Sequence, residues 1–258
     1  MDLREARVVL RERRLLDVLD LAVRFLVAHA APYAVLSAFV LVPCGVATVM
    51  IAAHAGFAWA LTFALALAAL AEVPFTVLGS RLVFESDVSF AQVLRTSLRR
   101  APLVLVTRLI VFVAAAIGGT MLLLPGIWVA VSFLYVTEIV ALEEAGVGTA
   151  MSRAQRMLQG RFGDALVAWM LLGGIHLGAT WLGDRALATV LADLFQITPP
   201  AKLGDPDGGV LGLVAFWLAL PYVTTARLFS YLDLRTRTEG WDVQVRFAAL
   251  ARREETER

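Results

Sequence analysis

Six blocks of apolar residues, each close to 20 residues long, follow one another along this chain and are separated by short polar segments. An α-helix rises about 1.5 Å per residue, so a block of this length crosses a hydrocarbon core about 30 Å thick. The expected fold is therefore an all-α, polytopic helical membrane protein. The six predicted transmembrane helices cover residues 32–53, 57–78, 102–124, 127–142, 165–182 and 209–231.

Shorter segments beside these blocks have a different pattern, in which apolar residues recur at helical spacing and arginines lie between them. This pattern is typical of a helix that lies on a membrane surface with one face in the lipid. We expect such amphipathic helices on the cytoplasmic side at residues 10–26, 90–98 and 147–158. Residues 186–195 suggest a further one, in the long connection before the last span.

The same pattern divides the chain into an amphipathic N-terminal helix (1–31), a six-span membrane domain (32–231) and a charged C-terminal tail (232–258). Pro125-Gly126 predicts a tight turn between the third and fourth spans, because proline fixes φ and glycine adopts conformations that other residues avoid.

An amphipathic segment followed by two spans occurs three times, which allows three parallel repeats. Any six-span protein with basic inner loops would share part of this similarity, so a true repeat and a coincidental one both stay open.

Charge predicts the orientation of the spans. The chain is 59% hydrophobic and carries 23 lysines and arginines against 22 acids, but the positive charges are unevenly placed. Apart from Arg185, Lys202 and Arg108, they all precede the first span, lie in the 79–101 and 143–162 loops, or follow from Arg227 onward. Because positive loops are retained in the cytoplasm, both termini are expected there. These basic segments would attract anionic lipid headgroups; nucleic acid is not an expected partner, because the same charges are needed for topology.

Three charged residues are predicted at membrane depth: Glu72, Arg108 and Glu138. Ionisable groups within spans are costly and often functional. The three could form a proton- or ion-linked polar site, or a salt-bridged cluster that only fixes helix packing. The sequence favours the structural interpretation and leaves the functional one open.

No other pattern indicates catalysis. The chain shows no nucleophile with a base, no phosphate-binding loop and no dinucleotide fingerprint. The single cysteine, Cys44, excludes a disulfide within one chain and a cysteine zinc site. His176 has no second ligand at helical spacing, so we expect it to donate an interhelical hydrogen bond rather than bind metal. We therefore expect no enzyme activity, no metal and no cofactor.

Two groups of motifs resemble the membrane-domain family of bacterial glycerophosphoryl diester phosphodiesterases and its uncharacterised six-helix inner-membrane relatives. The first group surrounds the fourth span, and the second follows the sixth. The first contains Pro125, Gly126, Glu143, Arg153, Gly160 and Arg161. The second, which is the more specific, contains Tyr231, Asp233, Arg235, Arg237, Glu239, Gly240 and Asp242. The chain departs from the family pattern at Ala154, where the family usually has serine.

The resemblance implies an integral protein of the bacterial cytoplasmic (inner) membrane, and it does not imply phosphodiester hydrolysis. In family members that are enzymes, a separate soluble domain carries the catalysis, and no segment here is long enough to hold one. We therefore expect a non-enzymatic scaffold or accessory protein that acts through lipids or unknown protein partners. The alternative is a transporter or channel-like protein that uses Glu72, Arg108 and Glu138.

We call the second group, from Tyr231 to Asp242, the closing motif. Its charges alternate in sign just beyond the sixth span. They would either pair with the basic inner segments and clamp the tail onto the cytoplasmic face, or remain solvated in an unordered tail. The clamp is favoured, because Trp241 and Val243 would need burial or a membrane surface.

Overall fold

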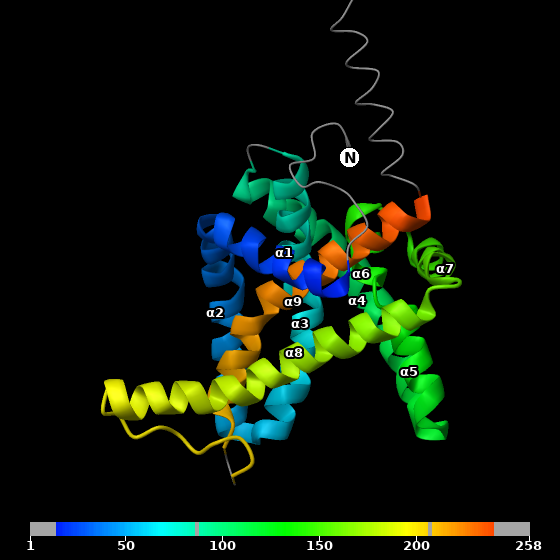
Figure 1. The fold of residues 1–258 in the computed structure, drawn as a ribbon. Helices are drawn as coiled ribbons and strands as arrows, with labels where there is room; N and C mark the ends of the chain where they lie inside the picture. Colours follow the sequence, from blue (N-terminus) through cyan, green and yellow to red (C-terminus); the bar gives the residue numbers. More distant parts are fainter. Residues whose placement is uncertain (1–13, 86–87, 206–207, 240–258) are drawn as a thin grey trace, which may run out of the picture.

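The computed structural model describes residues 14–85, 88–205 and 208–239, and in these residues the chain is helical, without a strand pair beyond one isolated bridge between Leu203 and Asp205 (Figure 1). Six helical segments in this part of the chain are long and apolar enough to cross a membrane. The predicted all-α, six-span membrane fold is therefore confirmed.

The described residues form nine α-helices, and a π-helical segment, Val190–Leu194, extends the eighth. Their bounds are α1 Leu15–Ala28, α2 Ala30–Ala55, α3 Phe57–Phe84, α4 Phe90–Met121, α5 Leu123–Ser132, α6 Val136–Leu142, α7 Val147–Leu158, α8 Phe162–Thr189 and α9 Val210–Glu239. The spans are α2, α3, α4, the pair α5 and α6, α8 with its π-helical extension, and α9.

The bundle has two ends (Figure 1). We call the end with the α3–α4 and α6–α7 connections and the last turns of α9 the basic end. We call the opposite end, with the connection over residues 195–209, the loop end. Helices α3, α6 and α9 form the centre, while α2, α4 and α8 expose long apolar faces, as expected where lipid surrounds the protein.

Helices α3, α4, α8 and α9 extend well past the predicted spans, because helical structure continues beyond the apolar blocks; α3, for example, runs to Phe84 rather than ending at residue 78. Residues 90–98 are not a separate surface helix but the first turns of α4, and residues 186–195 continue α8. Helix α9 runs to Glu239, past the predicted end of the sixth span at residue 231, and the boundary between membrane domain and tail stays a prediction. Its extension is held by packing, since Leu232, Leu234 and Thr236 are buried.

The predicted turn at Pro125-Gly126 is also wrong. Helix α4 ends at Met121 and α5 begins at Leu123, so the chain reverses around Leu122. Pro125 lies in the first turn of α5, where its missing N–H costs no hydrogen bond. Gly126 is a contact residue instead: a Cβ there would lie 2.8 Å from the Ala115 carbonyl oxygen of α4.

The fourth span is broken, whereas the sequence predicted one helix. Residues 133–135 form a turn between α5 and α6, in which the N–H of Phe133 donates to the Val129 carbonyl and the N–H of Leu134 to the Val131 carbonyl. The stretch contains neither proline nor glycine, so no local signal marks the break. The side chains are buried, and the Tyr135 hydroxyl lies 2.7 Å from that of Ser230 on α9. Tertiary packing therefore accompanies the break.

Helix α1 has a buried and an exposed face. Val18, Ala22 and Phe25 are buried, and the Phe25 ring meets the Phe229 ring of α9 edge to face at 5.0 Å. Arg24 pairs with Asp20 on the exposed side. The two faces agree with the predicted periodicity, and its position at a membrane surface stays a prediction.

Candidate functional site

Four charged side chains meet inside the bundle, each from a different helix. Glu72 comes from α3, Arg108 from α4, Glu138 from α6 and Arg227 from α9. Glu72 Oε2 accepts hydrogen bonds from Arg108 Nη2 at 2.7 Å and from Arg227 Nη2 at 2.8 Å. Arg227 Nε donates to Glu138 Oε1 at 2.6 Å. We call these residues the four-charge cluster; its two carboxylates and two guanidinium groups balance in formal charge.

Burial increases from one side of the cluster to the other. The Arg108 side chain is 28% exposed, that of Glu72 13%, that of Arg227 6% and that of Glu138 not at all. Arg108 Nε also donates to the Thr137 hydroxyl at 2.7 Å, next to Glu138 in sequence. A charge taken out of water this completely is tolerated only with close partners. Arg227 and Glu138, the two least exposed members, therefore depend most strongly on each other for compensation of their charges.

The structure brings together all three residues that the sequence singled out and adds Arg227. The charge pattern along the chain groups Arg227 with the basic stretch after the last span. It nevertheless lies within the predicted span 209–231, four residues before its end. This position was the signal for a fourth charge at membrane depth.

One acceptor position in the cluster has no partner. Glu138 Oε2 is buried and accepts no hydrogen bond from the described residues. The hydroxyls of Thr76 and Thr224 are likewise buried without a partner in this part of the chain. They lie about one helical turn along from Glu72 and Arg227, respectively. The interior beside the cluster therefore has unused polar groups.

A second group of polar residues lies at the basic end and joins α9 to α7. Glu143, at the end of α6, accepts a hydrogen bond from the Tyr231 hydroxyl and pairs with Arg153 and Arg235. We call this the Glu143 cluster. Because its members come from the α6 terminus, α7 and α9, it fixes the last turns of α9 against the α6–α7 connection.

The closing motif is thus helical and ion-paired as far as it is described. Its described part contacts the acidic Glu143 through Tyr231 and Arg235, whereas Asp233 pairs with Arg237 of the same helix at 2.8 Å. The predicted partner, a basic inner segment, is therefore replaced by Glu143, and the position of the tail on the cytoplasmic face stays a prediction. Gly240 and Asp242, with Trp241 and Val243, lie outside the described residues, and Glu239 is the last residue of α9.

The remaining motif residues have local roles. Gly160 has φ +78°, a conformation that favours glycine, in the turn between α7 and α8. Arg161 precedes α8 and lies 3.8 Å from Asp164 in its first turn. His176 Nε2 lies 3.0 Å from the Phe216 carbonyl of α9; because a carbonyl only accepts, the imidazole donates. This confirms the predicted interhelical bond of His176.

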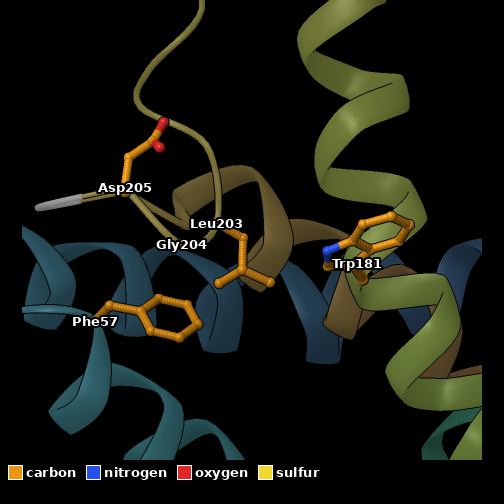
Figure 2. Close-up of a pocket in the computed structure, with 6 residues that line it drawn as sticks. Phe57, Trp181, Leu203, Gly204 and Asp205 are labelled. Atoms are coloured by element: carbon orange, nitrogen blue, oxygen red, sulfur yellow. The ribbon is translucent and has the colours of Figure 1, made fainter.

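At the loop end, Asp184 binds the connection back onto the bundle. Its carboxylate is fully buried and accepts the N–H groups of Leu203 and Gly212, both at 2.9 Å. A pocket of about 460 Å³ lies near it, between Phe57, Trp181 and residues 203–205 and 208 (Figure 2). In Figure 2 the Asp205 carboxylate points away from Phe57 and Leu203. The pocket is therefore lined by the apolar side chains of Phe57, Trp181 and Leu203, and Asp205 is the one charged residue among its described lining.

Comparison with protein-family models, with curated proteins and with solved structures found no match to this chain.

Proposed function

We propose that this protein is a non-enzymatic membrane scaffold or accessory protein whose four-charge cluster holds the helices together. The observation that carries the proposal is the mutual pairing of the four charges. Each arginine contacts a carboxylate within 2.8 Å, and the formal charges cancel. A site that binds and releases an ion needs a charge that the protein itself does not compensate.

The cost of placing a charge inside a membrane favours the same role. A single charged side chain at the centre of a membrane helix costs about 2.5–3.5 kcal/mol or more. Four helices that each carry one such charge can avoid the cost only by meeting. The cluster therefore favours the arrangement in which α3, α4, α6 and α9 meet, in addition to the apolar packing and the hydrogen bonds between helices.

The partners we propose are anionic lipid headgroups and unidentified proteins at the basic end. Arg95 and Arg99 are exposed on the first turns of α4, and Arg156 is exposed on α7. Each arginine close to an anionic surface contributes about 1 kcal/mol of attraction. Together with the family resemblance, the arginines support a bacterial inner-membrane protein with its basic end and both termini in the cytoplasm.

A transporter or channel-like function is the second candidate, and one observation favours it. The fourth span is broken three residues before Glu138, whose Oε2 has no partner among the described residues. Discontinuous helices next to unsatisfied polar groups line the substrate sites of many transporters. In that case Glu138 would bind a proton or cation at Oε2.

The variant Glu138→Gln separates the two candidates. We expect the wild-type protein, reconstituted into liposomes with an internal pH-sensitive dye, to give no proton flux above protein-free liposomes. We expect the variant to unfold at a lower temperature in detergent, because Arg227 loses one of its two ionised partners and keeps only Glu72. A proton flux in the wild type that Glu138→Gln abolishes would instead establish the transporter.

The proposed orientation is tested by cysteine labelling on a Cys44→Ala background. Lys202→Cys lies at the loop end and Arg99→Cys at the basic end, and both positions are exposed. In intact spheroplasts, a membrane-impermeant maleimide should label Lys202→Cys and not Arg99→Cys. The reverse pattern would place the basic end outside the cytoplasm.

A further inference from the structure

A cavity of about 300 Å³ lies at the basic end between α1, α7, α8 and α9. Its volume is at the lower limit of small-molecule sites in proteins, about 300–1,000 Å³. Its wall is mostly apolar and includes Leu15, Val18, Leu158 and Ala168. Neither the four-charge cluster nor the Glu143 cluster uses it.

The charged side chains that line this cavity have both signs: Arg14, Asp164, Asp233 and Arg237. Asp233 and Arg237 pair with each other at 2.8 Å. Arg14 makes no ion pair with any described residue, and Asp164 has only a distant one, 3.8 Å from Arg161. The lining therefore offers one cation and one anion whose charges are poorly compensated within the described part of the chain.

One edge of the cavity is continuous with the lipid-facing side of the protein. Val167 lines the cavity and is 50% exposed. It begins a stripe of exposed apolar residues along α8 at helical spacing, which continues with Met170, Leu177 and Trp181. A ligand with an acyl chain could therefore place its headgroup in the cavity and its chain along this stripe.

We propose that the cavity binds a phospholipid whose headgroup carries a primary ammonium, such as phosphatidylethanolamine. Its phosphate accepts charge-assisted hydrogen bonds from Arg14, and its ammonium donates to Asp164. A purely anionic headgroup would satisfy Arg14 and place a negative charge near Asp164. A quaternary ammonium has no N–H to donate. This inference deepens the proposed lipid interaction and rests on the membrane setting proposed above.

The test is native mass spectrometry of the delipidated full-length protein in detergent. The added probe is an equimolar mixture of phosphatidylethanolamine, phosphatidylglycerol and phosphatidylcholine with identical acyl chains. We expect the wild type to retain phosphatidylethanolamine in preference to the other two. Arg14→Gln and Asp164→Asn should each weaken that binding about tenfold, the loss of one charge-assisted hydrogen bond.

Arg24→Gln is the matched control. Like Arg14→Gln it removes an exposed arginine, but Arg24 does not line the cavity. It should bind lipid as the wild type does. Both test positions are exposed, so the variants should fold, and unfolding temperatures will verify this. Equal retention of the three lipids, or unchanged binding in both variants, would overturn the proposal. Neither result would affect the scaffold proposal, which the flux and stability measurements test separately.

Discussion

Replacing Arg227 with leucine should destabilise the protein more than any other single change in the cluster. The substitution leaves Glu138 fully buried without its guanidinium partner and removes one of the two cations that contact Glu72. Removing one partner of a buried ion pair costs about 3–5 kcal/mol, because the remaining charge is uncompensated. Thermal unfolding of the purified protein in detergent, followed by intrinsic tryptophan fluorescence, measures the loss.

Arg24→Leu is the control for this experiment. It removes an arginine of the same charge whose side chain is 77% exposed and whose partner, Asp20, is 59% exposed. Exposed pairs contribute little to stability, so the control should unfold at the wild-type temperature. If Arg227→Leu also unfolded at that temperature, the cluster would not hold the helices together.

Outside the four-charge cluster, replacing Gly126 with alanine should have the largest effect. A Cβ at this position would lie 2.8 Å from the Ala115 carbonyl oxygen and 2.8 Å from Gly119 Cα, and both are backbone atoms that cannot rotate away. The α4–α5 hairpin would have to open, at a cost of about 1–3 kcal/mol. The same unfolding measurement applies, with loss of monodisperse protein in size-exclusion chromatography as the sign of a more severe effect.

Gly119→Ala is the matched control, since it lies on the same hairpin and a Cβ there has no atom within 4 Å. Alanine favours a helix over glycine by about 1 kcal/mol, so this variant should be as stable as the wild type or more so. Equal stability of the two variants would contradict the close approach of α4 and α5 at Gly126.

The number of spans followed directly from the sequence, because a lipid-spanning segment must be both long and continuously apolar. The residues at which the helices begin and end did not follow from the sequence. Hydropathy marks where a helix enters the membrane, whereas α3, α8 and α9 continue beyond that point and α4 begins before it, with Pro102 inside the helix. Pro125 and Gly126 illustrate a different error, because both residues are common in turns. Here Pro125 lies in the first turn of α5, and Gly126 packs against α4. The break at residues 133–135 has no local signal at all.

The candidate site was partly predictable for a similar reason. Charged residues within apolar blocks are conspicuous, which identified Glu72, Arg108 and Glu138. Arg227 was missed because it is close enough to the end of its span to be counted with the basic residues that follow. The pairing itself depends on the rotation of four helices about their axes, which near-uniform apolar blocks do not encode.

The most direct test of the structural role of the cluster is a double-mutant cycle between Arg227 and Glu138. The variants Arg227→Leu, Glu138→Leu and the double variant are compared with the wild type by equilibrium unfolding in detergent. In the double variant Glu72 and Arg108 still balance each other, so we predict less destabilisation than the sum of the single changes. The expected coupling is about 2 kcal/mol or more, at the upper end for residues in contact. Additive effects, with a coupling near zero, would contradict a cluster that holds α6 and α9 together.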